Sequence, residues 1–208
     1  MRNLEMVEIG LIDHSDCESI MKEMQQKRIE DKIGDKLLIC EHPEIVTVGP
    51  RAKNDGIVPP AGYDISFVDR GGGLTWHGPG QIVIYPIIKW DLENESNVKS
   101  VIEKLESWVI ATFDSIGLKG YRDDRMQGVW VDEHKVCSIG LSFLRWTSRH
   151  GLTINYDTPS GRVEMVSGCG LGVDTTTSLS ALGYKVTRDQ ILNSLIENVD
   201  QLSRKLIQ

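Results

Sequence analysis

Residues 70–81 of this 208-residue chain read Arg-Gly-Gly-Gly-Leu-Thr-Trp-His-Gly-Pro-Gly-Gln. They lie between two apolar segments that we predict to be β-strands, residues 65–68 and 81–88. Five glycines and one proline among these twelve residues remove side chains at places where another molecule can approach the backbone. We therefore predict that residues 70–81 form a ligand-binding loop around which the fold is arranged.

Glycine-rich stretches also serve other purposes, and each leaves its own pattern. Gly-Gly and Gly-Pro-Gly occur in ordinary turns, but a turn does not need the side chains of Arg70, Trp76 and His77 between its glycines. A phosphate-binding loop would continue as Gly-Lys-Ser/Thr, and a dinucleotide fingerprint would lead into a helix. The sequence has neither feature, so no nucleotide site is predicted here.

The chain before the loop carries one helix pattern and several strand patterns. Ser15 and Glu18 form a capping-box pattern ahead of an amphipathic helix over residues 15–33, which should end at Gly34. Cys17 would lie in its first turn as a structural residue. The other predicted elements are strands over residues 36–40 and 45–48, with His42 in the turn between them, and a loop over residues 50–63.

The chain after the loop alternates strands and helices. Residues 81–88 are almost entirely apolar, as in a strand that is covered on both faces, so this strand should lie centrally in a sheet. Apolar residues at helical spacing predict a helix from Val98 to Phe113 that stops at Gly117, and Thr187 with Gln190 caps a final helix. Between these helices we expect antiparallel strands over residues 128–131, 135–146 and 150–155, with a turn at 147–149.

This mixed order of elements predicts an α+β fold with a mixed, mostly antiparallel sheet flanked by helices, in a single domain over residues 1–208. The formal net charge of −7 and the pI near 5.3 argue against a nucleic-acid partner, which would require a basic face. No run of eighteen apolar residues is present, and residues 1–10 lack the apolar core of a signal peptide. We therefore expect a cytoplasmic protein without a membrane partner.

The four cysteines are expected to be reduced thiols, because they are widely spaced and no export signal is present. No Cys-x-x-Cys pair occurs, and the five histidines show no pairing at i, i+4. The local spacing therefore predicts no metal site.

The motifs along the chain together resemble the lipoyl(octanoyl) transferase family, and the resemblance covers nearly the whole sequence. Within the loop it rests on Arg-Gly-Gly followed by Thr-aromatic-His-Gly-Pro-Gly-Gln, with Tyr85 and Pro86 beyond. The other matching motifs are Glu41-His42-Pro43, Thr47-Val48-Gly49, Gly128-Val129-Trp130-Val131, Lys135, Ser138-Ile139-Gly140, His150-Gly151-Leu152, Asn155, Cys169-Gly170 and Thr177-Ser178-Leu179.

The resemblance implies a fold, a reaction and partners. The expected fold is the catalytic core shared with biotin and lipoate protein ligases. The expected reaction moves an octanoyl or lipoyl group from octanoyl-acyl carrier protein to a lysine of a lipoyl domain through a cysteine thioester, without a cofactor. The implied acceptors are the lipoyl domains of 2-oxoacid dehydrogenases and the H protein of glycine cleavage.

Cys169 is the predicted nucleophile, because its small neighbours expose it and reactive thiols favour open, electropositive surroundings. A helix that begins near Thr177 would direct its positive end toward this thiol. Lys135 matches the lysine that in this family lowers the pKa of the cysteine and relays protons. Cys137 follows Lys135 by two residues on a strand and should point to the same face, so it is a rival nucleophile.

Carried over by resemblance, the substrate-binding residues come from three segments. Residues 70–77 should surround the acyl chain and its carrier attachment, in an apolar tunnel whose depth selects the chain length. His150 would support the site or act as an ordinary core histidine. The predicted substrate-binding residues are Arg70, Gly71, Gly72, Gly73, Leu74, Thr75, Trp76, His77, Ser138, Ile139, Gly140, Gly151, Leu152 and Thr153.

Some residues depart from the family pattern and leave two alternatives open. Gly73 makes residues 71–73 similar to the triple glycine of ATP-dependent lipoate ligases, Trp76 replaces a tyrosine or phenylalanine, and Gly168 stands where proline is frequent. A lipoate or biotin ligase would tend to have aspartate after His77 and needs no cysteine at position 169. The other alternative, a non-catalytic lipoyl-domain binder, does not explain why both Cys169 and Lys135 are present.

Overall fold

The computed structural model describes residues 1–166 and 175–207. Its strands form a seven-stranded sheet in the order β10-β1-β2-β6-β9-β8-β7 and a three-stranded sheet in the order β4-β3-β5. The strands are β1 (Arg2–Leu11), β2 (Asp35–Glu41), β3 (Ile45–Val48), β4 (Ile65–Phe67), β5 (Leu74–His77), β6 (Gln81–Ile87), β7 (Gly128–Val131), β8 (His134–Leu144), β9 (Thr147–Asn155) and β10 (Arg204–Ile207). The helices are α1 (His14–Ile29), α2 (Pro50–Asn54), α3 (Val98–Ser115) and α4 (Arg188–Glu197), with a short 3-10 helix over Val199–Leu202.

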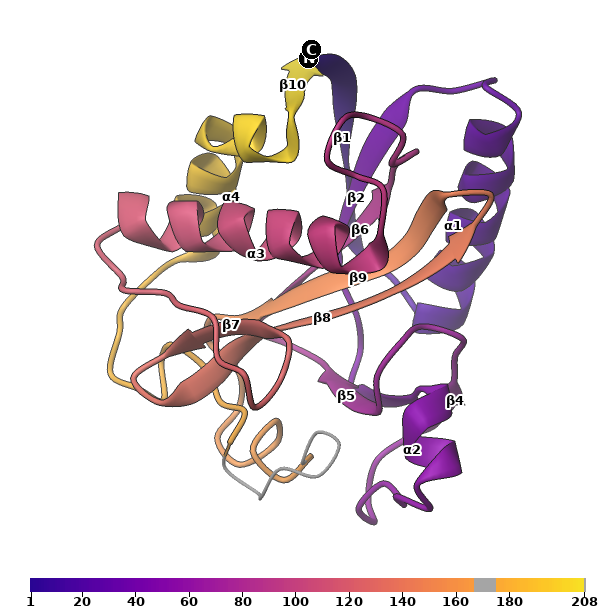
Figure 1. Ribbon diagram of the computed structural model, residues 1–208. Helices are drawn as coiled ribbons and strands as arrows, with labels where there is room; N and C mark the ends of the chain where they lie inside the picture. Colours follow the sequence, from indigo (N-terminus) through magenta and orange to yellow (C-terminus); the bar gives the residue numbers. More distant parts are fainter. Residues whose placement is uncertain (167–174, 208) are drawn as a thin grey trace.

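Helices cover both faces of the large sheet (Figure 1). Alternate residues of β2 point to opposite faces: Leu37 and Ile39 pack in the core beneath α3 and α4, whereas Leu38 packs beneath α1. Parallel pairing of β1 with β2 and β10 accompanies antiparallel pairing among β2, β6, β9, β8 and β7. The predicted α+β class with a mixed, mostly antiparallel sheet is therefore confirmed.

Strand β6 is the fourth of the seven strands, and every one of its residues is buried, as its apolar sequence predicts. It contains Pro86, which has no N–H to donate to a neighbouring strand. Its pairing with β9 ends at Ile84, and a Cβ at Gly151 of β9 would lie only 2.0 Å from the Ile84 carbonyl oxygen and 2.5 Å from the Pro86 ring. Gly151 thus lets β9 pass close to the proline.

Part of the predicted loop is a strand. Residues 74–77 form β5, which pairs antiparallel with β3, while β4 pairs with β3 on its other side. The glycines therefore flank a strand on both sides, instead of forming one continuous loop. The predicted loop over residues 50–63 likewise contains the short helix α2, which begins with Pro50 at a position that needs no N–H donor.

The first helix differs from its prediction at both ends. Its N-cap is Asp13, so Ser15 lies inside the helix and the predicted capping box is wrong. The helix stops at Ile29, before Gly34, and Asp31 adopts a left-handed φ of 55°. By contrast, the capping box of Thr187 with Gln190 at the start of α4 is confirmed. The predicted end of α3 just before Gly117 is also confirmed, and Gly117 has a φ of +77°.

The hairpin between β8 and β9 turns two residues earlier than predicted. Leu144 pairs with Thr147, and the two residues between them, Arg145 and Trp146, have φ angles of 45° and 60°. A two-residue turn with both φ angles positive normally uses asparagine or glycine. Arg145 and Trp146 are neither, so the sequence does not indicate a turn at this position. Here Trp146 stacks on Phe143 with ring centroids 5.3 Å apart and donates its indole N–H to the Glu95 carbonyl.

The edge strand β10 and its neighbour β1 have no counterpart among the predicted elements, and both ends of the described chain meet there (Figure 1). Arg204 of β10 is fully buried and hydrogen-bonded to Asp35 at 3.1 Å and to Glu95. This ion network joins β10 to β2 and to the segment before α3.

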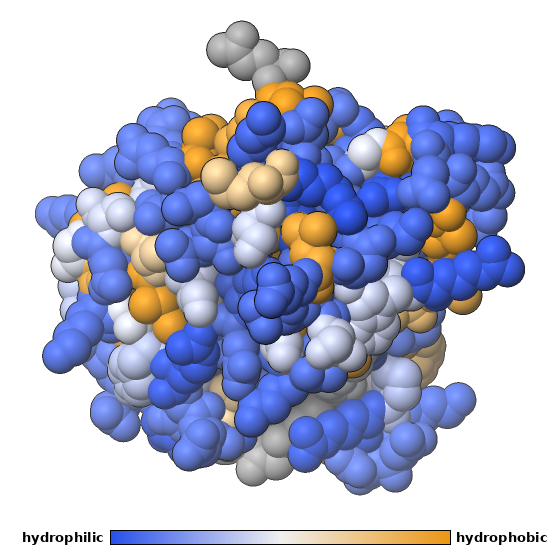
Figure 2. All heavy atoms as spheres, turned by 45° about the horizontal axis from the view of Figure 1, so that its top comes forward, coloured by the Kyte–Doolittle hydropathy of each residue, from blue (hydrophilic) through white to orange (hydrophobic). Residues whose placement is uncertain are grey.

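The hydrophobic residues on the face drawn in Figure 2 form small separate spots in a mostly hydrophilic surface. Among the helices of the described residues, none is long and apolar enough to cross a bilayer.

Candidate functional site

A narrow cavity lies where the loop segment, β6, β8 and β9 meet, with about 310 Å³ of empty space that includes its opening to solvent. Three predicted substrate-binding segments contribute to its wall, although they are up to 83 residues apart in sequence (70 to 153). Its predicted members are Arg70, Thr75, His77, Ser138, Gly140, Gly151, Leu152 and Thr153. His150 also lines this cavity, and its Nε2–H donates a hydrogen bond of 3.0 Å to the Asp69 carboxylate.

A neighbouring groove, with about 800 Å³ of empty space that includes open solvent, is lined by the predicted loop residues Gly71, Gly72, Gly73 and Leu74. It is lined by residues 70–75, by Ser138 and Ile139 of β8, by Lys135, and by residues 124–127. The Gly71 N–H donates to the Leu141 carbonyl at 2.9 Å, and a Cβ at Gly140 would lie 2.8 Å from the Gly71 carbonyl oxygen. Glycine at position 140 therefore allows the loop to lie directly on β8.

Arg70 stabilises the conformation of the loop through buried hydrogen bonds. Its guanidinium is buried and donates to the Thr47 carbonyl at 3.0 Å, to the Thr47 hydroxyl at 2.8 Å and to the Gly73 carbonyl at 3.0 Å. These bonds cross from β3 to the turn formed by residues 71–73. Arg70 therefore orders the glycines as well as lining the cavity.

Trp76 is the predicted loop residue that faces away from the first cavity. Its ring packs in a separate apolar cluster with Val46, Val163 and Val166, and its indole N–H donates to Glu44 at 3.0 Å. A Cβ at Gly78 would lie 2.3 Å from this ring. Trp76 therefore supports the loop through packing.

Sequence reasoning missed two residues of the first cavity, His14 and Tyr85. Tyr85 belongs to a motif that carried the resemblance, whereas His14 follows a helix N-cap and shows no signal of its own. His42 lies in the connection between β2 and β3, as predicted, and is also fully buried; its ring centroid lies 5.3 Å from that of His14 and 5.9 Å from that of Tyr85.

The histidines around the cavity are held in their neutral form. Burial lowers the pKa of His14 to about 4, with a further contribution from His42, and burial also lowers the pKa of His150 to about 4. Burial lowers the pKa of His77 well below its ordinary value. The imidazoles in the wall are therefore uncharged at neutral pH.

A chain of hydrogen bonds leads from His77 to the far side of the site. His77 Nδ1 lies 2.9 Å from the Gln81 amide oxygen, and the Gln81 amide donates to Asn155 Oδ1 at 2.8 Å. Asn155 in turn donates to the Thr177 carbonyl at 3.0 Å, and the Thr177 hydroxyl donates to Glu164 at 2.7 Å. The loop is thus connected to residues on both sides of 167–174.

Lys135 lies in the same region and is buried, with Nζ 2.6 Å from Met126 Sδ. Its N–H donates to the Thr175 carbonyl at 2.8 Å, and its carbonyl accepts from the Thr177 N–H at 3.0 Å. Lys135 also shares a pocket wall with Val166 and Thr176. The described chain on each side of 167–174 therefore approaches Lys135.

Cys137 does not share the face of Lys135, and the prediction that it would is wrong. The pairing of β7 with β8 shifts register between the Val129–Cys137 and Trp130–Lys135 pairs, so the strict alternation of side chains is broken here. Lys135 shares two pocket walls with Ser138, whereas Cys137 is buried in the main core. Burial raises the pKa of Cys137 to about 12, which keeps it a protonated thiol.

The predicted nucleophile, Cys169, lies outside the described residues. The predicted helix near Thr177 is wrong, because residues 175–187, all of them described, contain turns and extended chain. No helix N-terminus within 175–187 is therefore present to lower a thiol pKa.

Comparisons with known proteins find chains of similar sequence and similar fold. The family model described as "Lipoyl protein ligase A/B catalytic domain" matches residues 15–200. An octanoyltransferase from Syntrophobacter fumaroxidans is 31% identical, with 97% of this chain and 91% of that protein covered. An octanoyltransferase from Corynebacterium glutamicum is 36% identical over 93% of this chain and 78% of that protein.

Among solved structures, the fold is similar to that of a putative lipoate protein ligase from Thermoplasma acidophilum with bound lipoic acid. The TM-score is 0.71 at 13% identity, with coverage of 100% of this chain and 88% of that one. A biotin protein ligase variant from Aquifex aeolicus in complex with biotin has a TM-score of 0.58 at 13% identity, over 96% of this chain and 70% of that one. At these identities the likeness concerns the fold.

Proposed function

Because this chain belongs to the octanoyltransferases within the lipoyl protein ligase A/B catalytic-domain family, we propose that its two adjoining cavities carry octanoyl transfer to a lysine of a lipoyl domain. The chain is an acyltransferase, and its acceptors are lipoyl-domain proteins. We treat residues 1–208 as one catalytic domain, since β1 and β10 from opposite ends of the chain are neighbours in one sheet.

We assign the acyl-accepting thiol to Cys169, with Lys135 as its partner. The observation that carries this assignment is that Lys135 lines one pocket together with Val166 and Thr176, which precede and follow the segment that contains Cys169. Thr176 forms a parallel β-bridge with Lys135, only seven residues after position 169. Cys137 is a poor rival, because it is buried in the core with a pKa raised to about 12.

The proposed reaction has two balanced steps. In the first, the Cys169 thiolate attacks the thioester carbonyl of the donor, an S–C bond forms, and the carrier thiolate leaves and takes a proton. In the second, the acceptor lysine amine attacks the enzyme thioester, the C–S bond breaks, and the amine proton passes to the Cys169 sulfur. Lys135 favours the thiolate by its charge and carries the proton between the sulfur and the amine.

The rest of the site would position the acyl group. The first cavity, with neutral His77 and His150, accepts the octanoyl chain, and the groove along residues 70–75 accepts the carrier attachment. The oxyanion of each tetrahedral intermediate needs backbone N–H donors. The N–H of Gly71 is not among them, because it donates to the Leu141 carbonyl.

The donor we propose is octanoyl-acyl carrier protein in the cytoplasm, and the acceptors are the lipoyl domains of 2-oxoacid dehydrogenases and the glycine cleavage H protein. Since a thioester is already activated, transfer requires no ATP and no cofactor. The test mixes the purified chain with octanoyl-acyl carrier protein and an apo lipoyl domain without nucleotide, and follows intact masses. An octanoyl increment on the lipoyl domain is expected. Transfer only from free octanoate with ATP would assign the site to a ligase.

A further inference from the structure

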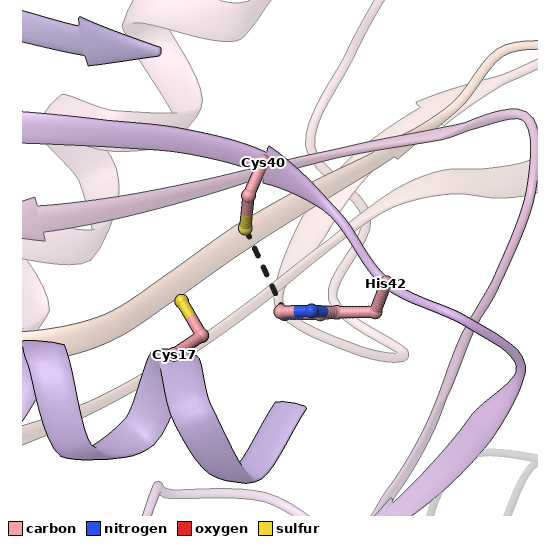
Figure 3. Close-up of side chains that lie close together, drawn as sticks. All are labelled: Cys17, Cys40 and His42. Carbon is pink, nitrogen blue, oxygen red and sulfur yellow. Dashed lines mark hydrogen bonds between the residues drawn. The ribbon is translucent and has the colours of Figure 1, made fainter. Parts of the chain in front are cut away.

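Two cysteines and one histidine meet between helix α1 and the large sheet. Cys17 comes from the first turns of α1, Cys40 from the end of β2, and His42 from the segment after β2. The two sulfur atoms point into the space between helix and strand, where the His42 imidazole enters from the side (Figure 3). All three residues are buried, with at most 1% of any side chain exposed.

The distances between the side-chain atoms of Cys17, Cys40 and His42 match those of a metal-binding site. The possible ligand atoms of the three residues all lie within 4.8 Å of one another, and Cys40 Sγ lies 3.7 Å from His42 Nε2. In tetrahedral zinc sites, Zn–S bonds of about 2.3 Å and Zn–N bonds of about 2.0 Å place sulfur and nitrogen about 3.6 Å apart. The sulfur–nitrogen pair therefore needs little movement to share one ion.

The imidazole is already oriented as a ligand. His42 Nδ1 lies 2.7 Å from the Ile12 carbonyl oxygen, which can only accept, so Nδ1 carries the proton. A hydrogen bond from the other ring nitrogen to a backbone carbonyl is the usual support of a metal-bound histidine. Nε2 keeps its lone pair, which faces Cys40 and the Tyr85 hydroxyl, 2.8 Å away.

We propose that Cys17, Cys40 and His42 form a binding site for a thiophilic divalent ion, Zn²⁺. Binding would release one proton from each thiol, so that two thiolates, a neutral imidazole and Zn²⁺ sum to zero charge. A neutral group suits the surrounding apolar layer of Met21, Leu38, Val83 and Ile87, where an uncompensated charge is costly. A monovalent ion with the same ligands would leave a buried net charge.

Tyr85 borders both this site and the first cavity. Its hydroxyl donates to His42 Nε2 and would have to give up this hydrogen bond when an ion binds there. His14 also lines the first cavity, and its ring contacts that of His42. The side chains of Tyr85 and His14 therefore lie where the cluster and the cavity adjoin. Since the three residues come from separate elements, local sequence spacing gave no sign of the site.

The site is testable with Co²⁺ and Zn²⁺ on the full-length chain, after treatment with a chelator and a thiol-free reductant. We expect Co²⁺ to produce a thiolate-to-metal charge-transfer band in the near ultraviolet, and one equivalent of Zn²⁺ per chain to remove it. Zn²⁺ should also raise the thermal midpoint. Cys40→Ser should abolish the band and lower Zn²⁺ affinity by more than the roughly 10- to 100-fold lost when only a hydrogen bond to a ligand is removed.

Cys137→Ser and Cys169→Ser are the matched controls, and both should keep the band and the bound Zn²⁺. A wild-type chain that is folded by circular dichroism and takes up neither ion would overturn the proposal. So would a band that is lost in Cys169→Ser but kept in Cys40→Ser, because the ion would then belong to the transfer site. If Cys40→Ser does not fold, His42→Gln gives the same comparison. None of these outcomes depends on octanoyl transfer.

Discussion

Lys135 and Thr176 lie side by side in a parallel β-bridge, although 41 residues separate them in sequence (135 to 176). The hydrogen bonds on either side of the bridge, to the Thr175 carbonyl and from the Thr177 N–H, hold the chain that follows residues 167–174 against the lysine. Asn155 holds the same chain from the other side, because its amide donates to the Thr177 carbonyl. This double attachment, rather than a helix, sets the position of that chain.

Asn155→Ala should reduce transfer more than its effect on stability explains. The change removes the donor to the Thr177 carbonyl and one of the two acceptors of the Gln81 amide, which still donates to the Trp76 carbonyl; the loss costs about 1–3 kcal/mol of unfolding free energy. Displacement of the chain near Lys135 should lower kcat about 100-fold, as small misplacements of catalytic groups do. Asn198→Ala, which removes a similar amide from the end of α4, is the control. Equal kcat losses in both variants would refute the positioning role of Asn155.

Cys169→Ala should abolish the octanoyl mass increment on the enzyme, whereas Cys137→Ala should keep it. The Cys137 thiol is protonated at neutral pH because burial raises its pKa to about 12. Intact mass after mixing with octanoyl-acyl carrier protein, followed by peptide mapping, makes the distinction. An acyl group mapped to Cys137, or full transfer by Cys169→Ala, contradicts the mechanism.

Lys135→Met should slow acylation most at neutral pH and recover in part at alkaline pH. Methionine removes the charge that favours the thiolate, so more of the thiol must be ionised by the solvent. Rates of single-turnover acylation across pH measure this recovery. If the rate does not recover, Lys135 acts instead as an obligatory proton carrier between sulfur and amine.

Alanine substitutions at Gly71 and Gly72 should distinguish an effect on transfer from an effect on stability. Gly72 has a φ of +92°, so Gly72→Ala should cost about 1–2 kcal/mol of unfolding free energy through backbone strain. A Cβ at Gly71 would be 3.5 Å from its nearest neighbour, the Leu141 carbonyl oxygen, so Gly71→Ala should fold normally. Its methyl group would enter the groove and lower kcat/KM for the carrier-bound donor at least about tenfold, or 1.4 kcal/mol. Normal kinetics for Gly71→Ala would show that the donor does not occupy this groove.

His14 should make the protein less stable as the pH falls. Its pKa is lowered to about 4 in the folded state, chiefly by burial, whereas an unfolded histidine has a pKa of about 6.5. Between these two pH values the unfolded chain therefore binds more protons than the folded chain. The free energy of unfolding is highest above about pH 6.5 and falls by about 3 kcal/mol in full as the pH falls toward 4. Chemical denaturation across this range should show a shallower loss for His14→Gln than for the wild type. His14→Gln with an unchanged slope would mean that another group accounts for the pH dependence.

The sequence predicted the elements whose signals are local. The apolar run of β6 indicates a strand covered on both faces, and the pair Thr187 and Gln190 marks a helix start; both are confirmed. Strand β10 is half-polar, so its sequence has no strand pattern. Arg204 in this strand is buried because it forms ion pairs with Asp35 and Glu95, which come from distant segments. The bulge between Lys135 and Cys137 depends on the pairing with β7, which residue spacing does not reveal.

The same limit applies to the candidate site. The loop residues and those of β8 and β9 were predicted through the resemblance, and the structure brings eight of them to one cavity. His14, His42 and Tyr85 meet because α1 packs across the sheet, a contact without any sequence signature.

Because β10 is the last strand to be synthesised, the large sheet can be completed only at the end of translation. Strand β1 is made first, but its neighbour on the open side, β10, follows about two hundred residues later, and the two pair through Arg2–Arg204 to Glu5–Ile207. Until Arg204 has left the ribosome, Asp35 and Glu95 lack a cation that they contact in the finished sheet. Asp35 still contacts Arg28, and Glu95 still contacts Lys104, so each buried carboxylate is then short of one of its cations. The large sheet therefore reaches its native stability only after translation has passed β10, and a ribosome stalled before Arg204 would hold a less stable chain.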